Sequence, residues 1–450
     1  MNSWAKDAIF YHIYPLGLCG APEHNDFNCP PEERLNKLYP WVDHIAGLGA
    51  NAVYLGPLFE SSTHGYNTAD YYRVDRRLGT NETLKALAQT FHARGIRVVL
   101  DGVFNHVGRD FWAFKDVQAR RENSPYASWF TNLRFGGQSP YGDPFTYEGW
   151  DGHYSLVKLN LENPHVRAHL LDAVRMWIRE FDIDGLRLDA ADVVSLDFLR
   201  ELGQVCREVK PDFWLMGEIV FGDYRRWTNE GGLDSATNYE AYKSLYSSFN
   251  EHNMFEIAYA LNRQFGEGGI YRGLGLYSFA DNHDVNRIAS TLKDAAHLYP
   301  LHILLFSMPG IPSIYYGSEF GLEGKKTRGS DAPIRPSLDL NTLNASAPQP
   351  GLPGDIRRLA ALRNEHPALR HGDYRQLHVS ANQLAFVRQT AEECLLVAIN
   401  ASDQPAELSL NIPAAAQSAA FDILNHQPVT GQYGQFTLQL PARWGQIIKI

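Results

Sequence analysis

Four short stretches of the sequence combine carboxylates with histidine, asparagine or arginine, residue types that can carry out acid–base and nucleophilic chemistry. The stretches are Asp101-Gly102-Val103-Phe104-Asn105-His106, Gly185-Leu186-Arg187-Leu188-Asp189, Met216-Gly217-Glu218 and Asp281-Asn282-His283-Asp284. Each lies at the end of an apolar run that is typical of a buried strand. In a barrel of parallel strands the reactive groups project from the carboxyl ends of the strands, so these four stretches are candidates for one active site.

The second and third stretches predict two carboxylates in different protonation states. Arg187 and Asp189 are two residues apart, so on a strand they face the same side. A neighbouring guanidinium lowers the pKa of a carboxyl group, and we therefore expect Asp189 to be ionised. Glu218 follows an apolar run, and burial would raise its pKa and keep it protonated. Asp189 is thus a candidate nucleophile and Glu218 a candidate general acid.

Glycoside hydrolysis with retention uses this division of labour, with the two carboxyl groups about 5 to 5.5 Å apart. Neighbouring strand ends can supply such a separation. Taken singly, each stretch also has a purely structural explanation. An Arg-x-Asp pattern is often a structural ion pair, a Glu at a strand end often caps a helix, and His106 or His283 could be a buried, hydrogen-bonded histidine. The occurrence of four such stretches in order on successive strands favours catalysis.

The elements that must position these residues follow a strand and helix alternation, which predicts a parallel sheet covered by helices. The eight expected strands are Ala8–Tyr14, Asn51–Gly56, Ile96–Asp101, Ile183–Asp189, Phe213–Glu218, Leu233–Thr237, Leu276–Asn282 and Pro312–Tyr316. One helix is expected over residues 35–48 with Gly49 as its C-cap, and another begins at Asn163-Pro164. Eight such units predict a TIM (β/α)₈ barrel of the α/β class.

Two segments do not fit the barrel pattern. Residues 107–160 are too many for an ordinary loop after the third strand, and they predict a small inserted domain. After about residue 372 the helical pattern gives way to short alternating segments, which predict a C-terminal antiparallel β-sandwich over 373–450. The barrel itself is expected to comprise residues 1–106 and 161–372.

Composition excludes several other classes of protein. The formal net charge of −10 and the lack of a Lys/Arg run argue against a nucleic-acid partner. The four cysteines have no CxxC spacing, so neither a zinc site nor a disulfide framework is indicated. The amino-terminal residues Met1–Asp7 contain no long apolar segment, and the apolar stretch Leu301–Gly317 is interrupted by prolines. We therefore expect a cytoplasmic protein with no membrane partner.

The four stretches resemble, in order and spacing, the signature motifs of the α-amylase family of glycoside hydrolases. The stretches read DGVFNH, GLRLD, GE and FADNHD in this chain. Similar accessory motifs are His64-Gly65-Tyr66, Lys158-Leu159-Asn160 and the segment 310–317. The resemblance covers roughly residues 8–372. It implies the same barrel, an inserted domain after the third strand and a β-sandwich tail.

The resemblance also implies a role for individual residues. Asp189 would form the covalent glycosyl-enzyme, Glu218 would be the general acid/base, and Asp284 would hold hydroxyl groups of the distorted sugar. His64, Tyr66, His106 and His283 would contact the same sugar, and Arg187 would orient Asp189. Asp101 would tie strand-end loops together. No cofactor is implied for the chemistry, but Asn105 matches a position that supports a structural calcium ion in many family members.

Within the family, residues 64–79 and 97–108 are similar to the cyclomaltodextrinase, neopullulanase and maltogenic amylase branch, whose members cut maltooligosaccharides, cyclodextrins and pullulan. Those enzymes usually carry an extra amino-terminal domain, whereas the first expected strand here begins near residue 8. Asp189 is followed by Ala190-Ala191-Asp192, without the Lys-His pair that many secreted α-amylases use to hold long chains. Short α-1,4-linked substrates are therefore expected, and the oligomeric state is left open.

Three alternatives remain open from the sequence. An α-glucan transglycosylase would use the same three carboxylates, with an acceptor sugar in place of water. A non-catalytic sugar-binding protein generally lacks one of these carboxylates, and all of them are present here. The aromatic residues of the predicted inserted domain could form either a sugar-stacking wall or the core of that domain; they are Trp112, Trp129, Phe145, Trp150 and Tyr154.

Overall fold

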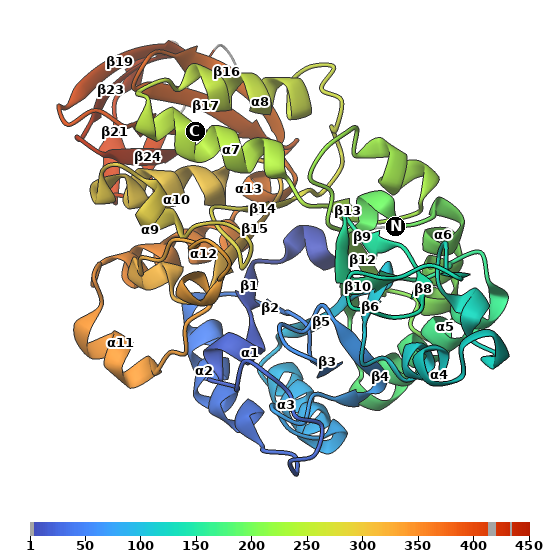
Figure 1. The fold of residues 1–450 in the computed structure, drawn as a ribbon. Helices are drawn as coiled ribbons and strands as arrows, with labels where there is room; N and C mark the ends of the chain where they lie inside the picture. The colour runs from blue at the N-terminus through green and yellow to red at the C-terminus, as the bar shows by residue number, and fades with distance from the viewer. Residues whose placement is uncertain (1–3, 413–419, 433) are drawn as a thin grey trace.

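The computed structural model describes residues 4–412, 420–432 and 434–450. Of the amino-terminal stretch Met1–Asp7, the first three residues lie outside the described part, and Trp4–Asp7 form a 3₁₀ helix, η1. Figure 1 shows a barrel whose strands β1, β2 and β5 lie near the centre of the view, with the C-terminal sheets in orange and red at one end and the segment that carries β6 to β10 on the right.

Eight parallel strands form the barrel in the order β13-β12-β11-β5-β2-β1-β15-β14. Their bounds are β1 Phe10–Ile13, β2 Ala52–Leu55, β5 Arg97–Gly102, β11 Gly185–Leu188, β12 Trp214–Gly217, β13 Ser235–Ala236, β14 Tyr277–Phe279 and β15 Ile311–Tyr315. A parallel bridge between Thr237 and Tyr277 joins the two outer strands and closes the barrel. Every expected strand is found. Six strands are shorter than their predicted ranges, and β5 and β15 are shifted by one residue.

Helices cover the outside of the barrel. They are α2 Tyr39–Leu48, α3 Asn81–Ala93, α5 Pro164–Phe181, α6 Leu196–Val209, α7 Tyr239–Asn250, α8 Phe255–Phe265, α10 Leu298–Ser307 and α12 Leu352–Glu365. Gly49 caps α2 in the left-handed conformation, and the Asn163 side chain accepts a hydrogen bond from the His165 amide at the start of α5, as the sequence predicts. The predicted helix over 35–48 begins instead as a 3₁₀ helix, η2 (Arg34–Leu38), because Pro40 favours the start of a new helix.

Shorter elements occupy the loops of the barrel. They are α1 Pro15–Leu18, β3 Phe59–Ser61, β4 Thr68–Val74, η5 Ala191–Val193, the π-helical η6 Arg226–Glu230, α9 Ile288–Thr291, η7 Ala295–His297, η8 Ser318–Phe320, η9 Ala332–Ile334, α11 Leu340–Ser346 and α13 Pro367–His371.

The inside of the barrel is filled by large side chains that alternate along the strands. One buried cluster contains Phe10, Tyr54, Val99, Trp214, Met216, Tyr277 and Phe279. The strands that precede Asp189 and Glu218 approach each other closely at Gly185 of β11. A Cβ atom at this position would lie 2.6 Å from the Trp214 carbonyl oxygen of β12. A side chain at position 185 would therefore not fit against β12.

The segment that the sequence predicts as an inserted domain contains one α-helix, two short 3₁₀ helices and two small antiparallel sheets. Its elements are β6 His106–Gly108, α4 Trp112–Arg120, η3 Arg121–Asn123, η4 Ala127–Trp129, β7 Arg134–Phe135, β8 Phe145–Thr146, β9 Gly149–Trp150 and β10 His153–Lys158. Strands β6, β10 and β9 form one sheet, and β7 pairs with β8. The domain boundaries stay a prediction.

The C-terminal region folds as two antiparallel sheets, β16-β17-β18-β24-β20-β21 and β19-β23-β22. The strands are β16 Asp373–Val379, β17 Gln383–Gln389, β18 Cys394–Asn400, β19 Ala406–Asn411, β20 Ala420–Asp422, β21 Gln427–Val429, β22 Gly431–Gln432, β23 Gln435–Leu440 and β24 Trp444–Lys449. Side chains from both sheets share a buried apolar cluster that includes Val387, Leu396, Leu410 and Phe436, so the predicted β-sandwich is confirmed.

No helix in the described part of the chain is long and apolar enough to cross a membrane. The apolar stretch Leu301–Gly317 instead forms the end of α10 and the buried strand β15.

Candidate active site

The barrel brings the predicted carboxylates together at the carboxyl ends of its strands. In the sheet, Arg187 on β11 is the register partner of Asp101 on β5 and of Met216 on β12. Asp189 and Glu218 each directly follow a paired position, Leu188 and Gly217, so their backbones leave neighbouring strands side by side. This register explains why residues far apart in the sequence meet at one end of the barrel.

The Arg187 guanidinium lies beneath the carboxylates and contacts several of them. Its Nη1 donates to Asp101 at 2.9 Å and to Asp189 Oδ1 at 3.1 Å, and its Nη2 is 2.8 Å from Glu218 Oε1. Arg187 is 3% exposed, and although burial opposes its charge, the neighbouring carboxylates raise its pKa. Arg187 therefore holds Asp189 and Glu218 together rather than orienting Asp189 alone.

Burial controls the ionisation of the Asp189 and Glu218 pair. Burial raises the pKa of Asp189 well above its ordinary value, and the positive charge of Arg187 offsets this only in part because the nearby Glu218 acts against it. Burial likewise raises the pKa of Glu218, in the direction expected. Arg187 does lower the pKa of Asp189, as expected, but burial outweighs it, so the expectation of a net lowered pKa is wrong. A single guanidinium shared by several buried carboxylates does not compensate them all.

Asp284 behaves in the opposite way. Burial alone would raise its pKa, but contact with His283 and the positive charges of Arg335 and Arg187 hold it well below its ordinary value. His283 Nε2 lies 2.8 Å from Asp284 Oδ2, and Arg335 Nη2 donates to Asp284 Oδ1 at 2.8 Å. Asp284 is consequently held ionised, in contrast to Asp189 and Glu218, whose pKa values are raised.

The predicted histidines lie around the partly exposed side chains of Asp189, Glu218 and Asp284, a surface that we call the opening. His106 Nε2 is 3.8 Å from Asp189 Oδ2, and burial lowers the pKa of His106 to about 3. His64 accepts a hydrogen bond at Nδ1 from the Tyr66 amide, and burial lowers its pKa to about 4. Both imidazoles are therefore neutral near pH 7.

Tyr66 and Asp101 belong to the support of the site. The Tyr66 hydroxyl donates to Asp101 Oδ2 at 3.0 Å and also contacts His283 Nε2. Asp101 accepts a further hydrogen bond of 2.6 Å from the Tyr54 hydroxyl. Because Asp101 is fully engaged beneath the opening, its contacts agree with the structural role that the resemblance implies.

Three residues of the cluster were not singled out from the sequence. Arg335 lies on the long loop after β15, where no strand-end position marks it, and its Nε donates to the His283 carbonyl at 2.8 Å. Tyr14 follows β1 directly and lies under the Arg335 guanidinium, 4.7 Å from ring centroid to Cζ. Tyr239 follows β13 and donates to Glu218 Oε1 at 3.4 Å. Attention to strand ends would have found Tyr14 and Tyr239, but not Arg335.

The aromatic residues of the 107–160 segment divide between the two predicted roles. Phe145 and Trp129 are buried in apolar contacts, Trp112 packs edge-on against Trp129, and Tyr154 packs edge-on against Tyr147. Trp150 differs because its ring centroid lies 5.5 Å from that of His106, beside the carboxylates. Trp129 and Phe145 therefore belong to a local core, Trp112 and Tyr154 are exposed at its edge, and Trp150 lies beside His106.

Asn105, the residue predicted for calcium, is buried, and its side-chain nitrogen lies 3.3 Å from His106 Nδ1. Among the described residues no group of three or more His, Cys, Asp or Glu side chains is arranged to hold a metal ion. The donors around Asn105 therefore do not include the carboxylate cluster that calcium prefers, and the calcium ion stays a prediction.

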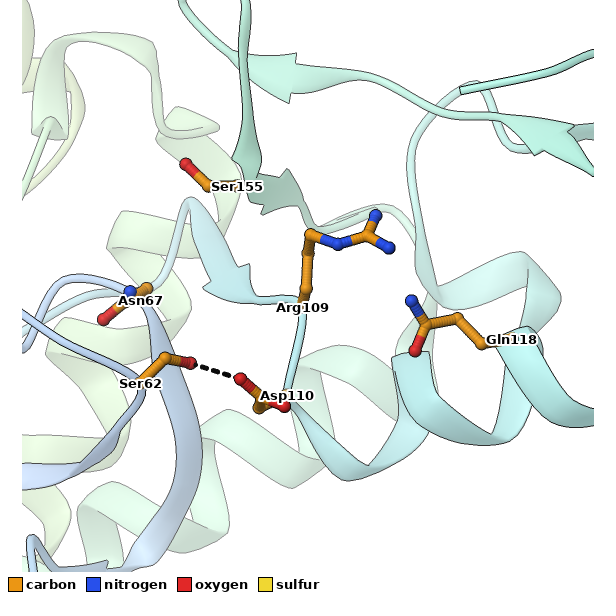
Figure 2. Close-up of a pocket in the computed structure, with 6 residues that line it drawn as sticks. All are labelled: Ser62, Asn67, Arg109, Asp110, Gln118 and Ser155. Atoms are coloured by element: carbon orange, nitrogen blue, oxygen red, sulfur yellow. Dashed lines mark hydrogen bonds between the residues drawn. The ribbon is translucent and has the colours of Figure 1, made fainter. Parts of the chain in front are cut away.

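A separate polar cavity of about 360 Å³ is lined by Ser62, Asn67, Arg109, Asp110, Gln118 and Ser155 (Figure 2). The Ser62 hydroxyl donates to Asp110 Oδ2 at 2.8 Å, and Arg109 is paired with Asp143 at 2.7 Å. None of the predicted catalytic residues lines this cavity, and its polar groups come from the loops beside β4 and β6, from α4 and from β10.

Comparisons with known proteins find relatives that match most of the chain. The family model "Alpha amylase, catalytic domain" matches residues 35–348, and "Maltogenic Amylase, C-terminal domain" matches residues 374–444. A cyclomaltodextrinase from a Bacillus species is 33% identical over 425 residues, which are 88% of this chain and 73% of that protein.

Two solved structures illustrate the likeness in fold. A cyclomaltodextrinase gives a TM-score of 0.87 at 30% sequence identity over 99% of this chain and 78% of that one. The cyclic α-maltosyl-(1→6)-maltose hydrolase from Arthrobacter globiformis, in complex with cyclic α-maltosyl-(1→6)-maltose, gives a TM-score of 0.83 at 28% identity over 99% of each chain.

The opposite pKa shifts of Asp189 and Asp284 predict opposite effects of neutralising them. A buried carboxyl group with a raised pKa destabilises the folded protein once the pH exceeds the pKa that the group has in the unfolded chain. Asp189→Asn should therefore raise the free energy of unfolding, by about 1 kcal/mol near pH 8. Asp284 has a lowered pKa in the folded protein, so it stabilises the fold at pH values above the pKa that it has in the unfolded chain. Asp284→Asn should therefore lower the free energy of unfolding at the same pH.

Denaturant unfolding of both variants and the wild type at about pH 5 and about pH 8 measures these effects. The advantage of Asp189→Asn should be smaller at the lower pH, because wild-type Asp189 holds its proton more of the time there. A stabilising Asp284→Asn, or an Asp189→Asn effect that does not grow with pH, would contradict the electrostatic description.

Proposed function

The chain belongs to the α-amylase family of glycoside hydrolases, and from that membership we propose that it hydrolyses short α-1,4-linked glucans, linear or cyclic. The family cleaves its substrates with retention of the anomeric configuration and needs no cofactor for catalysis. The observation that carries the proposal is the contact of one buried guanidinium, Arg187, with both Asp189 and Glu218 at the open end of the barrel.

In the proposed reaction, Asp189 attacks the anomeric carbon while Glu218 gives its proton to the glycosidic oxygen. The bond between the anomeric carbon and that oxygen breaks, and the leaving sugar departs with the proton. Water then attacks the anomeric carbon, Glu218 takes a proton from the water, and the ester bond to Asp189 breaks. The sugar leaves with its original configuration, and both carboxyl groups return to their starting states.

The charge balance of the cluster supports a retained proton. Asp101, Asp189, Glu218 and Asp284 are held by two guanidinium groups, those of Arg187 and Arg335. With more carboxyl groups than positive charges in a buried site, one proton stays on the Asp189 and Glu218 pair. A glycosidic oxygen is a hydrogen-bond acceptor, so a substrate whose oxygen lies against Glu218 draws that proton to Glu218 and leaves Asp189 ionised.

Two ring nitrogens around the opening have no hydrogen-bond partner among the described residues, His106 Nε2 and His283 Nδ1. Buried polar atoms of this kind are costly unless a ligand satisfies them. We infer that hydroxyl groups of the sugar fill this need at His106 and His283. Asp284, held by Arg335, would accept hydrogen bonds from two further hydroxyls as positive charge develops at the anomeric carbon.

The preference for short or cyclic glucans rests on three observations. No Lys-His pair follows the nucleophile, Trp150 offers one aromatic ring beside His106, and the similar proteins include a cyclomaltodextrinase and a hydrolase of a cyclic maltosyl-maltose. We also propose a cytoplasmic location, since short maltooligosaccharides are intracellular substrates in the branch that the sequence resembles.

Product analysis tests the substrate class and separates a hydrolase from a transglycosylase. Wild-type protein is incubated with maltotriose, β-cyclodextrin, pullulan and cyclic α-maltosyl-(1→6)-maltose, and products are followed by chromatography and by proton NMR of new reducing ends. From maltotriose and β-cyclodextrin we expect glucose and maltose, and from the other two substrates oligosaccharides that keep their α-1,6 bonds. The α-anomer should appear first because two inversions retain configuration. Saccharides longer than the substrate as main products would favour transfer, and an initial β-anomer would overturn retention.

Azide rescue tests which carboxylate has which role. With an α-maltosyl fluoride, whose leaving group needs no proton, Glu218→Ala should still form the glycosyl-enzyme, and azide should then give the α-glycosyl azide. On maltotriose the same variant should lose about 10²- to 10⁴-fold in kcat/KM. Asp189→Ala leaves a space on the opposite face of the sugar, so azide should enter there and give the β-glycosyl azide.

A matched control is Asp197→Ala, which removes an exposed carboxylate that pairs with Arg200 on α6 and lies outside the cluster. It should keep wild-type turnover and give no azide product. Azide products of the opposite configurations would exchange the roles of Asp189 and Glu218, and wild-type turnover in either variant would reject the assignment.

A further inference from the structure

A second cavity lies at the other end of the barrel, between its floor and the C-terminal sandwich. It has a volume of about 390 Å³ and is lined by residues that precede or begin β14 and β15, by the end of α13, and by Tyr374 on β16 and Arg388 on β17. Strands β14 and β15 begin here, whereas the proposed catalytic carboxylates follow strand carboxyl ends. Figure 1 shows α13 and the barrel strands β14 and β15 on the side of the barrel toward the C-terminal sheets.

The lining of this cavity is strongly basic. The cationic or protonatable side chains are Lys6, Arg272, Arg370, His371 and Arg388, and the acidic side chain that lines the cavity is Asp373. Asp373 is already paired with Arg272 at 2.6 Å. Arg370 and His371 share a second acid, Asp7, at 2.7 and 2.6 Å. Even with both acids counted, positive charge exceeds negative charge around the space.

Arg388 carries a buried positive charge without an acidic partner among the described residues. It is 1% exposed and donates only to carbonyl oxygens, those of Ser307, Leu369 and Gly372. Arg363, close behind it and fully buried, likewise donates to the carbonyls of Phe306, Leu369 and Gly310. The carbonyls accept hydrogen bonds from both guanidinium groups, although Arg363 Nε has no partner among the described residues, and they do not neutralise two charges.

The electrostatic cost is visible in both guanidinium groups. Burial lowers the pKa of Arg388 to about 9, and burial together with the charge of Arg388 lowers the pKa of Arg363 to about 9. Both values lie above neutrality, so both groups remain charged at pH 7. A buried pair of like charges of this kind favours an anion in the adjoining space.

Two buried polar atoms of residues that line the cavity also lack a partner among the described residues. The Tyr374 hydroxyl is buried, in a side chain that is 4% exposed, and it makes no hydrogen bond to the described residues. The same holds for Arg370 Nε. A hydroxyl and a guanidinium N–H are donors that suit phosphate oxygens. An unsatisfied buried donor costs about 1 to 3 kcal/mol, which a bound acceptor would recover.

From these contacts we propose that the cavity between the barrel floor and the C-terminal sandwich binds a phosphate-bearing small molecule. Arg388, Arg370 and Arg272 would provide the positive charge, and the Tyr374 hydroxyl would donate to a phosphate oxygen. The volume is that of a small-molecule site, so either inorganic phosphate or the phosphate group of a sugar phosphate could occupy it. The ligand would tie the C-terminal sandwich to the barrel and would not touch the substrate.

The polar cavity in Figure 2 carries no comparable argument. Its arginine is neutralised by Asp143, and its aspartate, Asp110, accepts from Ser62 and pairs with Lys115 at 3.0 Å. The charged groups there are already matched within the protein.

The test is isothermal titration of the full chain with inorganic phosphate, in a chloride buffer of constant ionic strength so that screening does not change. Wild-type protein should show one saturable site per chain. Tyr374→Phe removes only the unpartnered hydroxyl, and it should weaken phosphate binding by about tenfold or more, the loss expected for a hydrogen bond to a charged group. Without phosphate the same variant should unfold at the wild-type temperature or higher, because it removes an unsatisfied polar group.

Arg272→Gln should also weaken phosphate binding, by several-fold, since it removes one charge from the rim. The matched control is Arg175→Gln, which removes a partly exposed arginine paired with Asp172 on α5, away from the cavity, and should leave phosphate affinity unchanged. No saturable binding in the wild type, or equal affinity in Tyr374→Phe and wild type, would overturn the proposal.

Titration with α-glucose 1-phosphate identifies the source of the phosphate group. Tighter binding than inorganic phosphate, lost in Tyr374→Phe, would support a sugar phosphate as the ligand; equal binding, lost in the same variant, would support free phosphate. Sugar phosphate binding that survives Tyr374→Phe while inorganic phosphate does not bind would place the ligand at the catalytic opening and overturn the proposal.

Discussion

The active end of this barrel depends on one buried cation, the guanidinium of Arg187, which contacts Asp101, Asp189 and Glu218 at the same time. Removing several carboxylates from water is costly, and a single guanidinium compensates that cost only in part. The consequence is a pair of acids whose pKa values are raised by burial and which together retain a proton. A reaction that needs one ionised and one protonated carboxyl group can start from that state.

A second cation, Arg335, gives one acid of the cluster a different charge state from the others. Arg335 and His283 hold Asp284 ionised on the other side of the opening, so the cluster combines a proton-sharing pair with a permanently charged acid. Ground-state strain of this kind is typical of active sites, where residues are arranged for the reaction rather than for stability. Ala190, which directly follows Asp189, is strained as well. Its backbone adopts a left-handed conformation with φ of 44°, and its amide donates to Glu218.

The fold could be predicted well from the sequence because the barrel repeats a local pattern. Short apolar runs, Gly49 as a helix cap and Asn163-Pro164 as a helix start are local signals, and the structure contains them all. The helix at residues 35–48 was wrong in its first turn because Pro40 outweighs the apolar spacing. The meeting of the carboxylates could be predicted because the carboxyl ends of all the strands lie at one end of the barrel. The electrostatics could not: whether Arg187 serves one acid or several depends on the register of three strands, and Arg335 comes from a loop with no periodic signal.

The most direct test of this account is the identity of the residue that becomes covalently bound to the sugar. Wild-type protein treated with a fluorinated α-glucosyl fluoride, whose second step is slow, should accumulate a glycosyl-enzyme that survives digestion with pepsin. Mass spectrometry of the peptides should place the added sugar on Asp189. A label on Glu218 or Asp284, or inactivation without any covalent adduct, would contradict the arrangement in which Arg187 prepares Asp189 for attack and Glu218 for proton transfer.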